Sequence, residues 1–440
     1  MDGGKTPKMA KTSRPSAANV FLWEMKVGAV AWNPDRQIAE FEYAPSFIES
    51  GPDLSPLTLP RQRGIFSFPG LNPETFRGLP GLLADSLPDR FGNALIDVWL
   101  ARQGRSPDDF SPVERLCYIG SRGMGALEFK PALVRQATRS APVDIAELTS
   151  LANRVLNDRK ALELHLDKDE EQALNTILRV GTSAGGARAK ALIAWNPATG
   201  EVRSGQVASP PGFEQWLLKF DGVSDTMLAD PQGYGRIEHA YHLMALEAGI
   251  EMMESRLLEE GCRAHFMTKR FDRNPDGSKL HIQSLCGLAH YDYNIAGAHG
   301  YEQVFAIIHK LQLGYPALDE MFRRMTFNVV ARNQDDHTRN IAFIMDTNGR
   351  WSLAPAFDLT WAYNRSSRWT NLHQMSINGK RDDITRADIM TVAKQYRIRR
   401  AEHIIGKVVS AVKSWPDLAA RAGVDKKRSE YISSTHRTKI

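Results

Sequence analysis

The chain has 440 residues, of which 42% are hydrophobic and 24% charged, a composition that is typical of a water-soluble globular protein. No apolar run approaches the roughly 20 residues of a membrane-spanning helix, and the N-terminus lacks the apolar segment of a secretory signal. The three cysteines are scattered without C-x-x-C spacing, which disfavours a disulfide framework or a zinc site and favours a reducing, cytoplasmic location. The net charge of +5 permits nucleic-acid contact without implying it.

The N-terminal third of the chain is predicted to be rich in β-strands. Residues 1–18 are basic and rich in small polar residues, so they are expected to form a disordered tail. Short runs rich in Val, Phe, Trp and Tyr follow between residues 20 and 47, separated by turn residues, and they predict a small meander or barrel. Residues 79–104 then predict mostly helix, with Pro88 at a turn or at a helix start.

The middle of the chain mixes helices and strands, and the last third is mostly helical. Ser140 and Asp144 are both candidates for the N-cap of the first helix in this part. The predicted elements of the middle are helices over 140–156, 170–180 and 236–250, and strands over 191–195, 201–205, 214–220 and 264–273. The predicted helices of the last third are 301–313, 317–332, 386–396 and 399–415.

A polar stretch in the helical part, NQDDHTRN at residues 333–340, lies between two apolar segments. Asp335 and Asn340 have the D-x-x-x-x-N spacing of the catalytic loop in phosphotransferases with a kinase fold, where the Asp serves the attacking hydroxyl and the Asn binds Mg²⁺. A β-hairpin over residues 341–355 would bring Asp358 back beside Asn340 as a second metal ligand. Alternatively, Asp335, Asp336 and Asn340 could cap the end of a helix and fill a solvated loop. The spacing alone leaves the catalytic and the structural role open.

Three further features stand in the order expected of a kinase. The stretch TSAGGARAK at residues 182–190 is small, Gly-rich and basic, so its N–H groups and Arg188 or Lys190 are suited to phosphates, although a simple turn is the common role of Gly-Gly. Lys219 lies in a predicted strand, where it would bind the ATP phosphates of a kinase. The alternative is that it is an ordinary surface lysine of the strand. Glu238, on the next helix, is the predicted ion-pair partner of Lys219.

The order of these signals predicts the fold class. It is α+β, a protein-kinase-like two-lobed fold with a small β-rich N-terminal subdomain and a largely helical C-terminal lobe. The predicted parts are a tail over 1–18, a β-rich subdomain over 19–135, a kinase-like N-lobe with the Gly-rich loop over 136–266, and a mainly helical C-lobe over 267–440.

These segments resemble the HipA family of toxin–antitoxin serine/threonine kinases. NQDDHTRNIAF followed by LAPAFDL is similar to the family motifs N-x-D-x-H-x-K-N and L-x-P-x-Y-D, and SAGGARAK is similar to its Gly-rich loop. LLADSLPDRFG and KLHIQSLCGLA resemble two other family segments, so the resemblance covers about residues 19 to 415. It implies a protein kinase that uses ATP and Mg²⁺ and acts as the toxin of a toxin–antitoxin module.

The resemblance also implies roles for individual residues. Asp335 would be the catalytic base, Asn340 and Asp358 the Mg²⁺ ligands, and Ser183 a site of inactivating autophosphorylation, whereas Asp336 has no implied role because the motif is variable there. The residues implied for ATP binding are Gly185, Gly186, Ala187, Arg188, Ala189, Lys190, Lys219, Lys269, Arg270, Phe271, His337 and Arg339. The chain departs from the common family pattern at Arg188, Lys269, Arg339 and Phe357.

The implied partners are a helix-turn-helix antitoxin similar to HipB, a protein substrate among translation components such as an aminoacyl-tRNA synthetase, and operator DNA reached through the antitoxin. Two other functions stay open. One is a small-molecule phosphotransferase of the aminoglycoside or choline type, which shares the Asp/Asn/Asp logic. The other is a catalytically silent corepressor bound to an antitoxin. A metallohydrolase is disfavoured, because Asp335, Asp336 and His337 are adjacent and cannot all face one ion on a regular element.

Overall fold

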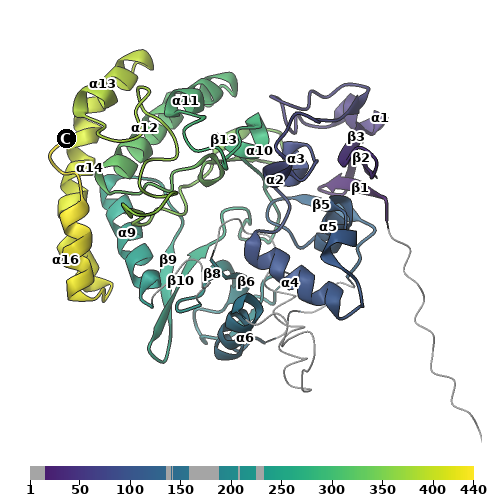
Figure 1. Ribbon diagram of the computed structural model, residues 1–440, viewed down its shortest axis with the longest axis horizontal. Helices are drawn as coiled ribbons and strands as arrows, with labels where there is room; N and C mark the ends of the chain where they lie inside the picture. The colour runs from purple at the N-terminus through teal and green to yellow at the C-terminus, as the bar shows by residue number, and fades with distance from the viewer. Residues whose placement is uncertain (1–14, 135–139, 141, 158–187, 207–208, 224–231) are drawn as a thin grey trace, which may run out of the picture.

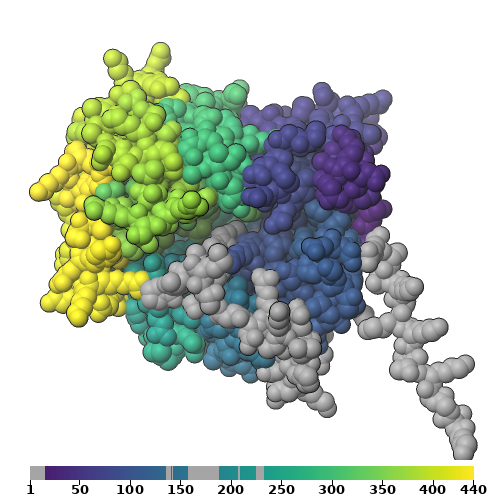
Figure 2. Space-filling model, viewed as in Figure 1, coloured from purple at the N-terminus to yellow at the C-terminus, as the bar shows by residue number. Residues whose placement is uncertain are grey.

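The described part of the chain forms three β-sheets and a helical body, which follow one another along the sequence. The computed structural model describes residues 15–134, 140, 142–157, 188–206, 209–223 and 232–440. In Figure 1 the N-terminal strands lie at the right, the second sheet at the lower centre, and the C-terminal helices at the left. Figure 2 shows the same division on the surface, with N-terminal and C-terminal residues gathered on opposite sides.

The first sheet is antiparallel, with its described strands in the order β4-β3-β2-β1-β5. Val20, Val30 and Phe41 are fully buried and alternate with exposed or half-buried neighbours, as expected for strands with one face on a core. The elements of this part are β1 Ala17–Leu22, β2 Met25–Asn33, β3 Ile38–Tyr43, α1 Pro45–Ser50, β4 Ile65–Phe66, α2 Pro73–Phe76, α3 Gly81–Ala84, α4 Arg90–Ala101, α5 Pro112–Ile119 and β5 Leu127–Lys130.

The second sheet has the described order β7-β6-β8-β10-β9. Helices α4 and α6 cover it, and Phe91 and Leu95 of α4 share a core with Leu148 of α6 and with Ile193 and Trp216 of the sheet. Helix α4 therefore joins the first part of the chain to this sheet. The elements here are α6 Ile145–Asn157, β6 Lys190–Trp195, β7 Val202–Ser204, β8 Glu214–Lys219, α9 Tyr234–Ala248, β9 Ser255–Glu260 and β10 Arg263–Lys269.

The remaining elements form a small sheet, β11-β12-β13, and the helical body. Helix α9 packs against β10 on one side and against α12, α14 and α15 on the other, so it connects the second sheet to the helices. The elements are β11 His281–Ser284, α10 Leu285–Ala289, α11 Tyr301–Lys310, α12 Tyr315–Val330, β12 Ala342–Met345, β13 Trp351–Leu353, α13 Arg386–Gln395, α14 Ala401–Lys413, α15 Trp415–Arg421 and α16 Lys426–Thr435.

The α+β organisation and the predicted hairpin are confirmed, since β12 pairs with β13 in an antiparallel register. Of the two predicted caps, Asp144 accepts the Glu147 N–H at 3.0 Å, whereas Ser140 was wrongly proposed because its hydroxyl donates to the Ser204 carbonyl.

The predicted helix over 170–180 lies outside the described residues. All three cysteines are free. None of the helices that the structure describes combines the length and the apolar character that a membrane crossing requires.

Candidate active site

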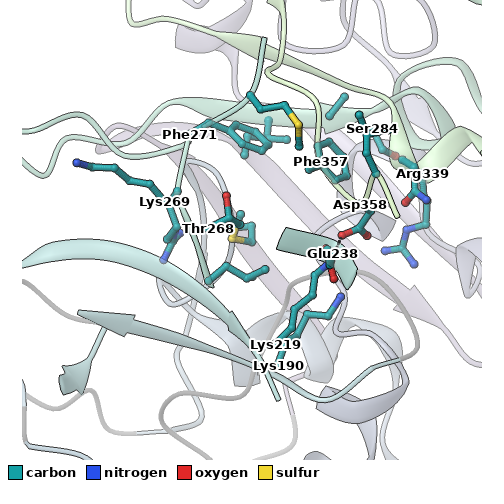
Figure 3. A pocket seen from close by; sticks show the side chains of 18 of the residues that line it. Lys190, Lys219, Glu238, Thr268, Lys269, Phe271, Ser284, Arg339, Phe357 and Asp358 are labelled. Atoms are coloured by element: carbon teal, nitrogen blue, oxygen red, sulfur yellow. Dashed lines mark hydrogen bonds and ion pairs between the residues drawn. The ribbon is translucent and has the colours of Figure 1, made fainter. Parts of the chain in front are cut away.

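A cavity of about 1200 Å³, measured with its open mouth, lies between the second sheet, α9 and the β11-β12-β13 sheet. Its walls come from segments far apart in the sequence, which Figure 3 shows converging on one space. The sequence-predicted residues that line it are Lys190, Lys219, Glu238, Lys269, Arg270, Phe271, His337, Arg339, Asn340 and Asp358. A concave site with apolar walls and a few convergent charged groups has the character of a ligand site.

The floor of the cavity holds a buried ion-pair cluster. The Lys219 ammonium, at the end of β8, donates hydrogen bonds to Glu238 Oε1 on α9 and to Asp358 Oδ1. Burial lowers the pKa of Lys219, but the charges of Asp358 and Glu238 outweigh burial and raise it above its usual value. Burial raises the pKa of Asp358, but Lys219 and Lys190 outweigh that effect and bring it to about 2. Lys219 and Asp358 are therefore both charged at neutral pH.

Lys190 adds a second ammonium to this cluster. It stands directly opposite Lys219 in the β6–β8 ladder and lines the same cavity. Its Nζ lies 4.0 Å from Oδ2 of Asp89, a residue that precedes α4 and that sequence reasoning did not single out. Burial raises the pKa of Asp89 to about 6, although the charge of Lys190 opposes the shift. Two ammonium groups beside one another suit a polyanionic ligand such as a nucleotide triphosphate.

The catalytic-loop candidates follow directly after α12. Asn340 lies in a single 3-10 turn, and its side-chain N–H donates to the Asp335 carbonyl at 2.8 Å. Within the described residues its Oδ1 accepts no hydrogen bond, and Asp358 keeps Oδ2 apart from the Lys219 contact. One amide oxygen and one carboxylate oxygen on the same cavity fit Mg²⁺, which is commonly held by one or two carboxylates together with substrate phosphates.

The Asp335 carboxylate is partly open to solvent, with 39% of its side chain exposed. Trp369 donates its indole N–H to Oδ1, and His337 Nε2 lies 3.7 Å from the same oxygen. Burial by neighbouring groups, with the charges of Asp358 and Asp336, raises the pKa of Asp335, while His337 and Trp369 lower it. Asp335 is therefore not one of the residues that line the cavity, but it lies within electrostatic reach of Asp358.

Asp336, to which the family motif gives no role, is an internal anchor. It is 3% exposed and accepts hydrogen bonds from the Tyr301 hydroxyl at 3.0 Å and the Gln374 N–H at 2.8 Å, and it pairs with His373 Nδ1 at 2.9 Å. These partners are about 35 residues or more away in the sequence, so no local signal marks the role. Asp336 ties the catalytic-loop candidate to the segment that follows Asp358.

The N-terminal part of the chain also reaches the cavity through Asp85, which follows α3. Asp85 accepts the backbone N–H of Ser284 at 2.6 Å and its hydroxyl at 2.7 Å. Its negative charge also raises the pKa of Arg339, whose guanidinium carbon lies over the Tyr293 ring, 5.3 Å from the ring centroid. Asp85 therefore positions one wall of the cavity from a different region of the chain.

The segment after β10 forms the opposite end of the cavity. Phe271 stacks on Phe357 with ring centroids 5.7 Å apart, and Lys269 pairs with Glu214 at 2.7 Å. Arg270 also lines the cavity, and its guanidinium binds Asp272 through two hydrogen bonds, so its expected role in ATP binding stays a prediction. The aromatic pair is suited to a flat ligand at this end of the cavity.

The Gly-rich loop is described only in its last residues. Ala189 is buried, Lys190 lines the cavity, and the Arg188 guanidinium lies 3.9 Å from the Tyr234 ring centroid. Ser183, Gly185, Gly186 and Ala187 lie outside the described residues.

Comparisons with known proteins place both halves of the chain in one family. Residues 18–130 match the HipA N-terminal domain, and residues 182–415 match the HipA-like C-terminal domain. The fold is similar to a HipA from Shewanella oneidensis whose structure was solved as a toxin–antitoxin complex of HipA, HipB and operator DNA, with a TM-score of 0.65, 17% identity, and coverage of 95% of this chain and 94% of that one.

A curated protein of Haemophilus influenzae named "Putative kinase" is 31% identical over 134 residues. The match includes 28% of this chain and only 39% of that protein's length, so it relates a segment and not two whole proteins. The C-terminal domain match alone takes in more than half of the 440 residues. The chain belongs to the HipA family.

Proposed function

We propose that the chain is an ATP-dependent protein kinase that transfers phosphate to serine or threonine hydroxyls. The observation that carries this proposal is the junction of Lys219, Glu238 and Asp358 on the floor of a cavity that Asn340 also lines. A strand Lys paired with a helix Glu, beside an Asp and an Asn suited to Mg²⁺, is the arrangement that protein kinases use.

Each residue of the chain has a separate task in this proposal. Lys219 and Lys190 bind phosphate oxygens, Glu238 orients Lys219, and the aromatic pair Phe271 and Phe357 holds the base. Asn340 and Asp358 hold Mg²⁺, which neutralises charge on the phosphates when it is bound.

Asp335 serves the acceptor. Its carboxylate takes the proton that the acceptor hydroxyl loses as the hydroxyl oxygen bonds to the γ-phosphorus and the bond from that phosphorus to the leaving ADP oxygen breaks. Family membership adds the rest of the proposal. The chain acts as the toxin of a toxin–antitoxin module, binds a helix-turn-helix antitoxin, reaches operator DNA through it, phosphorylates a translation-related protein and labels its own Ser183.

Transfer of label from γ-labelled ATP tests the activity. We expect the purified chain to label itself and a generic acceptor such as dephosphorylated casein, and expect chelation of Mg²⁺ with EDTA to stop the transfer. Asp335→Asn should lower the rate by on the order of 10³-fold, because it removes the proton acceptor but keeps the size of the side chain. Asp346→Asn, in the exposed β12–β13 turn, is the matched control and should label at the wild-type rate.

Three results would count against this assignment. If Asp335→Asn were labelled at the wild-type rate, Asp335 would not be the catalytic base. Transfer to an aminoglycoside or to choline, with none to protein, would favour a small-molecule phosphotransferase. A chain that binds antitoxin but not ATP with Mg²⁺ at millimolar nucleotide would favour the silent corepressor.

A further inference from the structure

One side chain from outside the catalytic-loop candidate reaches the Asp335 carboxylate. Trp369, 34 residues later, donates its indole N–H to Oδ1. Among the described residues this is the one hydrogen bond that the carboxylate accepts, and His337 Nε2 lies 3.7 Å from the same oxygen. Within the described residues Oδ2 accepts no hydrogen bond, and the Asp335 side chain as a whole is 39% exposed.

The main chain of Trp369 is fixed by a short closed loop, residues 364–370. The Ser367 hydroxyl accepts the backbone N–H groups of both Trp369 and Thr370 at 3.1 Å. The Asn364 N–H donates to the Thr370 carbonyl at 3.3 Å, and the Gln374 side chain donates to the Trp369 carbonyl. The ring therefore cannot leave Asp335 by a backbone movement without breaking several of these hydrogen bonds.

Both sides of this loop are attached to the residues that flank Asp335. Before the loop, the Ala362 N–H donates to the Arg332 carbonyl at 3.2 Å, and the Gln334 N–H donates to the Ala362 carbonyl at 3.0 Å. After the loop, His373 and Gln374 bind the buried Asp336. The loop and the catalytic-loop candidate are thus joined on both sides of the indole contact, and they position each other.

We propose that Trp369 is a positioning residue for the reaction: its indole N–H holds Oδ1 of Asp335, so that Oδ2 faces the acceptor hydroxyl. The proposal rests on the proposed kinase function. A hydrogen bond from one donor keeps the partly exposed carboxylate in a single orientation. The entropy of orienting the carboxylate is therefore not lost at the moment of proton transfer. The other loop side chains at the surface, Arg365 and Arg368, do not reach Asp335 through any described contact.

The first test separates turnover from binding. Trp369→Phe keeps an aromatic ring but removes the N–H donor and the pyrrole part of the indole, so we expect kcat to fall on the order of 10- to 100-fold while KM for ATP stays within about twofold. Trp361→Phe is the matched control, because Trp361 belongs to the same segment but donates its indole N–H to the Thr435 hydroxyl. Its kcat and KM should both stay within about threefold of wild type.

Unchanged kcat in Trp369→Phe would overturn the proposal. Raised kcat would overturn it as well, since it would mean that the indole blocks the carboxylate. An equal loss in Trp361→Phe, with lowered thermal stability in both variants, would show a merely structural segment. These outcomes are distinct from failure of the kinase assignment, in which Asp335→Asn itself labels like wild type.

The second test does not need activity. The chain contains nine tryptophans, and ¹⁵N-tryptophan labelling gives each indole N–H its own resonance, with those of Trp369 and Trp361 assigned by their loss in the Phe variants. We expect Asp335→Ala to move the Trp369 resonance and to leave that of Trp361 in place. If the chemical shift of the Trp369 indole N–H were the same in Asp335→Ala as in wild type, the proposal would be overturned, even in a chain that transfers no phosphate.

Discussion

Two adjacent carboxylates in the polar stretch have opposite surroundings. Asp335 is partly exposed and bound by one indole N–H, whereas Asp336 is buried and takes hydrogen bonds from three groups. A catalytic group needs access to its substrate, while a buried acceptor with several partners fixes structure. The difference between these neighbours predicts which of them controls chemistry and which controls stability.

The two Asp→Asn substitutions should separate these effects. Asp335→Asn should change the free energy of unfolding by less than about 0.5 kcal/mol while activity is lost. Asp336→Asn should lower it by about 2 to 4 kcal/mol, because a neutral amide cannot satisfy the same donors in a buried site. Urea unfolding followed by circular dichroism measures both. Equal stability of the two variants would contradict the anchoring role of Asp336.

In the proposed function, Lys219 contributes both to phosphate binding and to the stability of the fold. Lys219→Met should remove phosphate binding and lower kcat/KM at least 100-fold. It should also cost about 3 kcal/mol of stability, since Glu238 and Asp358 would remain buried without their shared counter-charge. Lys279→Met is a matched control, because Lys279 is also ion-paired, with Glu128 at 2.8 Å, but lies outside the cavity. Retained activity in Lys219→Met would contradict the phosphate-binding assignment.

At the residue scale, sequence spacing brought Asp335, Asn340, Asp358, Lys219 and Glu238 to attention because each lies at a recognisable offset within or between predicted elements. Their catalytic and binding roles stay predictions. The same reasoning missed Asp85, Asp89, Asp336 and Trp369. Those four act across separations of 34 to about 200 residues, and such contacts depend on chain packing that no local spacing encodes.

At the scale of elements, α3 and α10 meet backbone to backbone. A Cβ added to Gly81 would lie 2.2 Å from the Gly287 carbonyl oxygen, and one added to Gly287 would lie 2.2 Å from Asp85 Oδ2. Both distances are too short for any side chain, so glycine at these positions permits the close approach. The contact sets where Asp85 meets Ser284 at the wall of the cavity.

Gly287→Ala should therefore destabilise the chain by about 1 to 3 kcal/mol and weaken nucleotide binding, because the methyl group displaces Asp85. Thermal unfolding and titration with a fluorescent ATP analogue measure the two effects. Gly406→Ala is the control: Gly406 lies inside α14 with open space around it, so alanine should stabilise the helix by about 0.5 to 1 kcal/mol. A Gly287→Ala chain as stable as wild type would show that the two helices can separate at little cost.

Most described helices and strands were predictable because their apolar periodicity and caps are local. The 341–355 hairpin and the end of α9 at Gly249, which has a positive φ of 82°, are examples. The loop over 364–370 was not predictable, since it has no periodicity and is held by side-chain hydrogen bonds to its own backbone. The predicted boundary near residue 135 stays untested, although α4, which precedes it, packs on the second sheet.

At the scale of the whole molecule, Asp272 joins the segment after β10 to the N-terminal part. It is fully buried, binds Arg270 and Arg273, and accepts the Gly125 N–H at 2.8 Å. Burial raises its pKa, but the two guanidinium charges outweigh burial and lower the pKa to about 2. Because the folded pKa lies below the unfolded value of 3.8, the contribution to stability is present above pH 3.8 and is lost as the pH falls toward 2.

Asp272→Asn should remove this contribution. The free energy of unfolding of wild type should fall by about 2 kcal/mol more than that of the variant between pH 4 and pH 2. At pH 7 the variant should be less stable by about 3 to 5 kcal/mol, because Arg270 and Arg273 lose their buried counter-charge. Chemical unfolding across this pH range supplies both numbers. Parallel pH curves for the two chains would contradict the depressed pKa.

The contact between Asp85 and Ser284 also has a consequence for synthesis on the ribosome. Asp85 leaves the ribosome long before Ser284, Lys219 before Asp358, and Asp335 before Trp369. The walls of the cavity therefore cannot come together until the chain has been translated at least as far as Asp358. A message truncated anywhere before the codon for Asp358 should therefore yield fragments in which the cavity lacks part of its floor, and one truncated before the codon for Trp369 should yield fragments in which Asp335 lacks its indole donor.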